Sequence, residues 1–430
     1  MKTKDKKLKT LDLFAGCGGL TEGFEMTGSY ETLACVEWEK SSRDTLAHRL
    51  HAKWGYSDAD NRVLQFDAQR TEDLLDGWSD DPKYGSNDGL NRLVEARNGV
   101  VDLIVGGPPC QAYSIAGRIR DAHGMNNDYR NFLFETYVRL VKKFQPKIII
   151  FENVPGMLSA RPGGVPIIER VRRSFKEVGY SLIDNIKEHA VIDASDYGVP
   201  QNRKRLILFG IRNNSFEGDP QELLREFYTQ ILPSFKAKRK VTVAEAIFDL
   251  PKLMPNPNKK DCLKFSHLPQ VTNIANHKPR FHNERDMAIF HELALDNTHN
   301  NRRYKNIDDL KKLYTKATGK ISNIHKYYVL EKDKQSNTIV SHLYKDGLRH
   351  IHPDPKQARS ITVREAARLQ SFPDDFEFLG SIGDQYKMVG NAVPPILARA
   401  IAESITSFLI NNPVKNDRII LPSWSLSLQK

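Results

Sequence analysis

In the first half of the chain, short apolar runs alternate with stretches in which apolar residues recur at helical spacing. Short runs of apolar and β-branched residues are typical of buried strands, and a period of about 3.6 residues is typical of amphipathic helices. Two stretches have the helical pattern, Ser41–Leu50 and Asn131–Phe144. The predicted strands are Thr10–Phe14, Thr32–Val36, Arg62–Phe66, Val100–Val105 and Lys147–Phe151. This alternation predicts an α/β fold with a doubly wound, mostly parallel sheet.

Two later strands, Ser181–Ile186 and Leu206–Ile211, are predicted to form a β-ribbon at the edge of this sheet. The alternation stops at Pro251, where a linker rich in Pro, Asn and Lys begins. Composition shifts of this kind mark domain boundaries.

Helical patterns return near the C-terminus. Thr362–Gln370 has Thr and Glu at the spacing of a capping box, which marks a helix start. Pro394–Phe408 predicts another helix. We therefore expect residues 1–251 and 358–430 to form one α/β domain, interrupted by a smaller domain over residues 252–357.

The predicted insertion is strongly basic. The formal net charge of the chain is +11, and residues 252–355 hold 19 Lys and Arg against 11 Asp and Glu. The same stretch contains 9 of the 13 histidines. A concentrated positive charge indicates a polyanionic partner, most simply nucleic acid, and a solvated basic surface is the alternative that the charge alone leaves open.

The remaining composition is that of a soluble globular protein. No apolar run approaches the length of a membrane span, and the N-terminus has no signal-peptide pattern. The four cysteines, Cys17, Cys35, Cys110 and Cys262, lack the paired spacing of a zinc site or a disulfide framework. We expect reduced thiols, no metal, no membrane association and a cytoplasmic protein.

The turn after the first strand suggests a nucleoside cofactor. "LDLFAGCGGL" combines a strand, a glycine-rich turn and a helix start, so its backbone can approach a ligand closely. Glu37 ends the next strand, where a carboxylate can accept hydrogen bonds from ribose hydroxyls, and Trp38 offers a flat face for adenine. Because the turn lacks the GxGxxG of dinucleotide sites, S-adenosylmethionine fits better than NAD.

Further candidate residues stand directly after predicted strands. Asp67 could reach the adenine amino group, and Glu152 is placed for proton transfer. Cys110 lies beyond a strand, behind Pro108 and Pro109, which restrict the backbone. Ligands of open α/β sheets bind at this edge, so a nucleophilic Cys110 competes with the alternative of an inert buried thiol.

These motifs resemble the DNA cytosine-5 methyltransferases. "DLFAGCGGL", "GGPPCQAYS", "FENVPGML", "QNRKRLILFG" and "QYKMVGNAVPP" look like the signature blocks of that family, in the same order. The resemblance implies a Rossmann-like class I methyltransferase domain, and it makes residues 252–357 the target-recognition domain. It also implies double-stranded DNA as the partner and S-adenosylmethionine as the methyl donor.

The resemblance carries specific roles onto residues of this chain. Cys110 would be the nucleophile, Glu152 would hydrogen-bond the target base, and Arg203 and Arg205 would orient base and backbone. The implied cofactor-binding residues are Phe14, Ala15, Gly16, Cys17, Gly18, Gly19, Glu37, Trp38, Asp67, Pro108, Leu133, Asn391 and Val393. The thiolate would attack carbon 6 of a flipped-out cytosine and so activate carbon 5 for methylation.

Three other functions compete with this interpretation. One branch of the family modifies transfer RNA, but the large basic insertion favours DNA. A non-catalytic DNA-binding relative would be expected to have lost the cysteine or the glutamate, and both are present. A nicotinamide oxidoreductase would need GxGxxG. We expect a monomer, associated with the nucleoid if prokaryotic, with a restriction endonuclease as a functional and not a physical partner.

Overall fold

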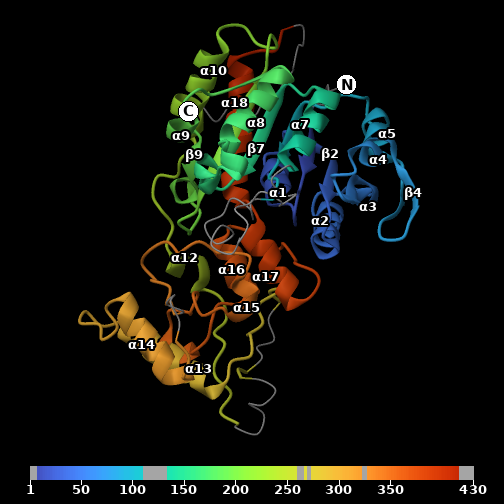
Figure 1. Cartoon of the computed structure of the whole chain (residues 1–430). Coiled ribbons are helices and arrows are strands. Elements are labelled where there is room, and N and C mark those ends of the chain that lie inside the picture. Colours follow the sequence, from blue (N-terminus) through green and yellow to red (C-terminus); the bar gives the residue numbers. More distant parts are fainter. Residues whose placement is uncertain (1–6, 110–132, 259–265, 269–272, 322–326, 416–430) are drawn as a thin grey trace, which may run out of the picture. The chain divides into compact units, whose positions relative to one another are not determined.

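The computed structural model describes residues 7–109, 133–258, 266–268, 273–321 and 327–415 (Figure 1). These residues divide into two compact units. The first unit contains residues 1–197, 204–237 and 393–430, and the second contains residues 198–203 and 238–392. The predicted insertion at 252–357 lies within the second unit, and its role in target recognition remains a prediction.

The first unit is built on a mixed sheet with the strand order β3-β2-β1-β6-β7-β10-β8, and β9 pairs with β10. The strands β1, β2, β3, β6 and β7 are parallel, whereas β10 runs antiparallel to β7, β8 and β9. The strands are β1 (Leu8–Leu13), β2 (Tyr30–Glu37), β3 (Val63–Gln65), β6 (Leu103–Gly106), β7 (Ile148–Asn153), β8 (Tyr180–Leu182), β9 (Val191–Asp193) and β10 (Lys204–Arg212). A separate hairpin pairs β4 (Trp78–Asp81) with β5 (Gly85–Asn87). The predicted mostly parallel α/β fold is confirmed.

Helices cover both faces of this sheet. The helices of the unit are α1 (Gly19–Glu25), α2 (Lys40–Ala52), α3 (Ala59–Arg62), α4 (Thr71–Asp76), α5 (Gly89–Glu95), α7 (Leu133–Phe144), α8 (Ile167–Glu177), α9 (Ile186–His189), α10 (Pro220–Glu226), α11 (Leu232–Ser234) and α18 (Pro395–Asn411). Short 3-10 turns occupy η2 (Pro155–Ser159), η3 (Pro162–Gly164) and η4 (Ala194–Tyr197), and Phe227–Ile231 forms a π-helical turn, η5.

Aromatic contacts show how the two faces are covered. On one face, Phe151 of β7 packs edge-on against Tyr137 of α7 at 5.3 Å and against Phe175 of α8. On the other face, Phe209 of β10 packs against Phe408 of α18 at 5.2 Å. Phe209 pairs in register with Ile150, and side chains alternate along a strand, so the two clusters lie on opposite faces.

The element boundaries differ from the prediction most at one edge strand, and β6 also begins at Leu103, three residues after the predicted Val100. We predicted a strand over Ser181–Ile186, but β8 ends at Leu182 and Ile186 begins α9. The side chain of Asn185 caps that helix by accepting a hydrogen bond from the Glu188 N–H. The capping preference of Asn therefore outweighed the apolar pattern.

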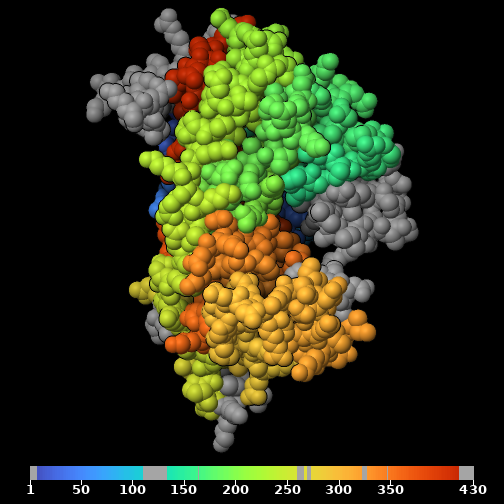
Figure 2. Space-filling view, turned by 90° about the vertical axis from the view of Figure 1, so that its left-hand side faces the viewer, coloured from blue at the N-terminus to red at the C-terminus, as the bar shows by residue number. Residues whose placement is uncertain are grey.

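The second unit contains no named strand among the residues that the structure describes there. Its helices are α12 (Val243–Ile247), α13 (Glu284–Asp296), α14 (Ile307–Thr318), α15 (Leu343–Asp346), α16 (Val363–Leu369) and α17 (Ile382–Asn391), with a 3-10 turn, η7 (Pro355–Gln357). The predicted capping box at Thr362 and Glu365 opens α16. The surface of α13 and α14 is visible in gold and orange in Figure 2.

One stretch of the described residues, Ile382–Asn411, is long and apolar enough to cross a membrane by length and composition. Its most apolar window is 72% buried inside the protein, as the core helices of soluble proteins also are.

Candidate active site

The turn after β1 depends on left-handed backbone at three positions. Phe14, Gly16 and Gly18 have φ values of 60°, 57° and 88°. A Cβ at Gly18 would also lie 2.4 Å from Leu46 Cδ1, so a larger residue would be strained by the backbone and would have to displace the Leu46 side chain. Left-handed backbone at a non-glycine residue such as Phe14 is uncommon and concentrates at functional sites. The backbone of the glycine-rich turn therefore has a specific, partly strained conformation at the start of α1.

Glu37 is fixed beside this turn at the end of β2. Its Oε2 accepts a hydrogen bond from the Gly16 N–H at 2.8 Å, and its Oε1 accepts one from the Glu39 N–H at 2.9 Å. Burial raises the pKa of the Glu37 carboxyl to about 7, against the lowering effect of these two donors. The neighbouring Trp38 side chain is 47% exposed. A held carboxyl group and an open indole face therefore stand together at the carboxyl edge of the sheet.

The hairpin β4–β5 adds residues that the sequence did not reveal. Its Trp78 stacks on Phe66 with ring centroids 3.8 Å apart, and Phe66 directly precedes the half-buried Asp67. The hairpin tip brings Lys83 Nζ to 5.7 Å from the Trp38 ring centroid. The contact with Tyr84 is the main cause that raises the pKa of Lys83, and the charges of Asp67 and Glu39 raise it further. Only the clustered aromatic residues at 78–84 hinted at this arrangement.

The ends of β6 and β7 form a second cluster. Gly106 pairs with Phe151, so the chain leaves β6 directly beside Glu152. The Asn153 side-chain amide donates a hydrogen bond to the Pro108 carbonyl at 3.1 Å. Gly107 lies so close to the Glu152 carboxylate that a Cβ there would be 2.5 Å from Oε2. The strand-end residues predicted from sequence are therefore adjacent in space.

Arg205 joins this cluster from β10. Its Nε lies 2.9 Å from Glu152 Oε1, and both side chains are nearly buried, at 12% and 13% exposure. A charge-assisted pair of this kind fixes the orientation of the carboxyl group and stabilises its negative charge. The Glu152 carboxylate is consequently held from one side by Arg205 and faces Gly107 on the other.

Cys110 and Cys262 lie outside the described residues. The other two cysteines, Cys17 and Cys35, are buried thiols outside any disulfide among the described residues, and burial raises the pKa of both. A thiol with a raised pKa is a poor nucleophile, because the thiolate is the reactive form. Neither of these buried cysteines is suited to nucleophilic catalysis.

The remaining predicted site residues differ in their surroundings. Pro108, Leu133 and Val393 are buried, and Asn391 is exposed at the end of α17. Arg203 is 1% exposed and donates hydrogen bonds to backbone carbonyls of the second unit. The predicted contact of Arg203 with the base stays a prediction.

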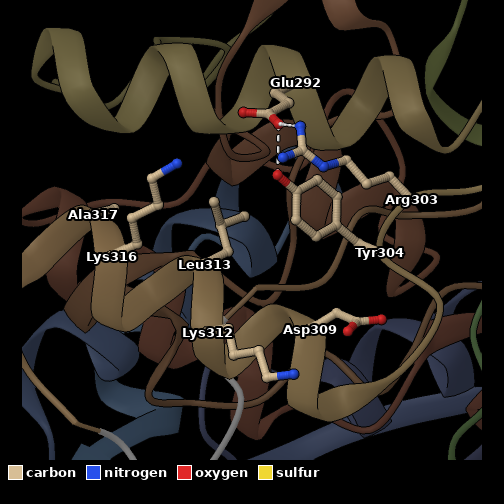
Figure 3. Close-up of a pocket in the computed structure, with 8 residues that line it drawn as sticks. All are labelled: Glu292, Arg303, Tyr304, Asp309, Lys312, Leu313, Lys316 and Ala317. Carbon is tan, nitrogen blue, oxygen red and sulfur yellow. Dashed lines mark hydrogen bonds and ion pairs between the residues drawn. The ribbon is translucent and has the colours of Figure 1, made fainter.

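The second unit carries a pocket of about 530 Å³ between α13 and α14 (Figure 3). At one end of it, Arg303 and Tyr304 both bind the Glu292 carboxylate. Lys312 and Lys316 line the other part and lie one helical turn apart on α14, exposed to solvent. The pocket thus presents two lysines on an exposed helix surface.

Five histidines of the second unit are buried: His267, His277, His282, His350 and His352. His277 Nε2 hydrogen-bonds the Pro251 carbonyl at 2.9 Å, and His282 Nε2 accepts from the Ser360 N–H at 3.2 Å. Burial lowers the pKa of both imidazoles, that of His282 to about 3. These two histidines are therefore neutral at physiological pH.

Comparison with known proteins adds a family. Residues 8–407 match the family model described as C-5 cytosine-specific DNA methylase. The chain is 34% identical to the type II methyltransferase M.Bpa9945I of Bacillus paralicheniformis, over 92% of this chain and 98% of that protein. It is 31% identical to the type II methyltransferase M1.HphI of Haemophilus parahaemolyticus, over 94% of this chain and 88% of that protein.

The fold also resembles a solved structure, that of a prophage-encoded E. coli protein assigned as a DNA modification methyltransferase. The TM-score is 0.61 at 23% identity, with 94% of this chain and 100% of that chain covered. At this identity the likeness concerns the fold.

Proposed function

This chain belongs to the C-5 cytosine-specific DNA methylases, and from that premise we propose a covalent route through Cys110 for its reaction. It is a DNA (cytosine-5)-methyltransferase of the type II modification kind, and S-adenosylmethionine is its methyl donor. The steps of the route and the residues that carry them are our proposal.

In this route the Cys110 thiolate adds to carbon 6 of a cytosine that has left the base stack. The new S–C6 bond breaks the ring's conjugation and places electron density on carbon 5. Glu152, which pairs with Arg205 as a carboxylate, takes up a proton as the base binds and then donates a hydrogen bond to ring N3, which offsets the developing negative charge. Carbon 5 takes the methyl group, and the S–CH3 bond of the donor breaks to leave S-adenosylhomocysteine. Carbon 5 then loses its proton to a base, and the S–C6 bond breaks to return the thiolate.

One observation carries this proposal: the segment that leads to Cys110 is tied to the end of β7. Asn153 holds the Pro108 carbonyl, and Gly107 lies against the Glu152 carboxylate. Only Pro109 separates Pro108 from Cys110 in the sequence. A rigid proline pair beside an anchored carboxyl group supports a nucleophile of fixed geometry next to its acid.

The residues at the edge of the first unit fit an adenosine cofactor. S-adenosylmethionine supplies a methyl group on a positively charged sulfur. Glu37 would accept hydrogen bonds from the ribose hydroxyls, Trp38 would stack on the adenine, and Asp67 would bind its amino group. The backbone N–H groups of Gly16 and Glu39 hold the two Glu37 carboxyl oxygens, which fixes the orientation in which they would meet the hydroxyls.

We also propose that residues 252–357 form the target-recognition domain. The two exposed lysines of α14, Lys312 and Lys316, support contacts to DNA phosphates. We propose that the enzyme acts as a monomer in the cytoplasm, associated with the nucleoid if the source is prokaryotic. A restriction endonuclease of the same specificity would be its functional partner.

A trapping experiment tests the covalent step. Bisulfite sequencing of DNA from cells that express the protein first identifies the methylated site. A duplex with 5-fluorocytosine at that position should then form a protein–DNA adduct, because fluorine cannot leave as a cation after methyl transfer. The adduct should require S-adenosylmethionine, survive denaturing electrophoresis and map to Cys110, and Cys110→Ser should form none. An adduct at another cysteine, or an active Cys110→Ala enzyme, would refute the route.

A further inference from the structure

Arg203 is held within the second unit by backbone carbonyls. Its guanidinium donates hydrogen bonds to the carbonyls of Ile339 at 2.8 Å, Gly390 at 3.0 Å and Ala392 at 2.9 Å. The side chain is 1% exposed. The two carbonyls from Gly390 and Ala392 belong to the residues on either side of Asn391, the last residue of α17.

Two buried glutamines act on the same helix end. Gln370 Nε2 donates to the carbonyls of Val389 at 3.0 Å and Ala392 at 2.7 Å. Gln201 Nε2 in turn donates to Gln370 Oε1, and both glutamines are 0% exposed. We call Gln201, Arg203 and Gln370 the carbonyl clamp.

The carbonyl clamp supplies hydrogen-bond donors to the unpaired carbonyls at the end of α17, and it also fixes the backbone around Asn391. The last carbonyls of any helix lack intrahelical partners and carry partial negative charge, so a guanidinium there is favourable. Here the clamp fixes the backbone before and after Asn391, while the Asn391 side chain stays exposed. Gly390 adds to the constraint, because a Cβ there would lie 2.3 Å from the Val340 backbone. An exposed polar side chain on an immobilised backbone is what a pre-organised ligand contact requires.

We infer that Arg203 and Gln370 are positioning residues for the cofactor, acting through Asn391, and that Arg203 does not contact the target base. The inference rests on our proposed function, and within it on the role in binding S-adenosylmethionine that the family resemblance implies for Asn391. It assigns different tasks to the two arginines of "QNRKR": Arg205 pairs with Glu152, and Arg203 fixes the helix end.

The test compares two buried arginines that the same substitution changes. Arg203→Lys keeps the charge and removes the planar fork. Arg364→Lys is the matched control, since Arg364 is 0% exposed and also donates to three backbone carbonyls of the second unit, at Ala275, Pro373 and Phe376. Calorimetric titration with S-adenosylhomocysteine gives the Kd of the cofactor site. Fluorescence anisotropy with a duplex that contains the target sequence gives the Kd for DNA.

We expect Arg203→Lys to raise the S-adenosylhomocysteine Kd by about tenfold, equivalent to ~1.4 kcal/mol, and to leave the DNA Kd within about twofold. Arg364→Lys should lower the Tm comparably but leave both Kd values nearly unchanged. Equal effects of the two variants on the cofactor Kd would overturn the inference, since both would then act only through stability. A weakened DNA Kd with an unchanged cofactor Kd in Arg203→Lys would overturn it in favour of a DNA contact.

Two further variants keep the test decisive. Gln370→Met removes the amide at similar length and should shift the cofactor Kd in the same direction, so it replaces Arg203→Lys if that protein does not fold. Asn391→Ala separates the two levels of the argument. If it leaves the cofactor Kd unchanged, the proposed role of Asn391 fails; if it weakens binding while both clamp variants do not, only the positioning role fails.

Discussion

Replacing Gly107 with alanine tests whether the reaction depends on the position of the Glu152 carboxylate. The added Cβ would lie 2.5 Å from Glu152 Oε2 and at an ordinary 3.5 Å from the Glu152 carbonyl oxygen. Van der Waals contact begins near 3.4 Å, so Oε2 must retreat by about 0.9 Å. No left-handed φ occurs at Gly107, so alanine adds no backbone strain.

The magnitudes separate stability from activity. Oε2 is the end of a rotatable side chain, and leaving the preferred rotamer costs of order 0.5–1.5 kcal/mol. A displacement of about 1 Å in a catalytic group can cost on the order of a hundredfold in rate, or ~2.7 kcal/mol in the barrier. We therefore expect kcat to fall about a hundredfold while the Tm changes by only a few degrees.

Gly106→Ala is the matched control one residue earlier. Its Cβ would lie 2.3 Å from the Leu13 carbonyl oxygen, which belongs to the backbone of β1 and cannot rotate away. Overpacking of that kind destabilises by about 1–3 kcal/mol or more. Methyl transfer from labelled S-adenosylmethionine to unmethylated DNA gives kcat, and thermal unfolding gives the Tm. A Gly107→Ala enzyme with kcat within about threefold of the parent would refute the reasoning, as would a loss of Tm matching that of Gly106→Ala.

Two other predictions concern the second unit. Lys312→Ala and Lys316→Ala should each weaken DNA binding uniformly across sequences and reduce the slope of log Kd against log salt concentration by about 1. Lys311→Ala is the control: the Lys311 ammonium pairs with Asp308, so its loss should change the slope less. Equal slopes in all three variants would exclude phosphate contacts by this face of α14. Burial lowers the pKa of His282 to about 3 in the folded protein. Below about pH 6.5 the unfolded chain therefore takes up a proton that the folded chain does not, and the free energy of unfolding falls as the pH falls. The contribution of His282 to this loss is about 2 kcal/mol at pH 5. Denaturant titrations at pH 7.5 and pH 5 should show this loss, and His282→Gln should reduce it. If the free energy of unfolding of His282→Gln differs between the two pH values as much as that of the parent, the imidazole of His282 is not the buried neutral group inferred here.

The sequence predicted the features that depend on near neighbours. Apolar runs and glycine-rich turns located the parallel strands, and the residues that follow strands lie at one edge of the sheet because parallel strands end on the same side. Glu37, Glu152 and the approach to Cys110 could be named for that reason. The capping box at Thr362 could also be predicted from sequence, because its two side chains lie within one helical turn of each other.

Tertiary structure decided what depends on residues far apart in the chain. "QNRKR" does not say which arginine serves which partner: Arg205 reaches Glu152, while Arg203 binds the Gly390 carbonyl, 187 residues away. The hairpin that carries Lys83 toward Trp38 is likewise fixed by the stacking of Trp78 on Phe66. Periodicity and capping are written in local sequence because they arise from the backbone's own geometry. The destination of a long side chain is set by which surfaces the packed chain buries together, and that is a property of the whole fold.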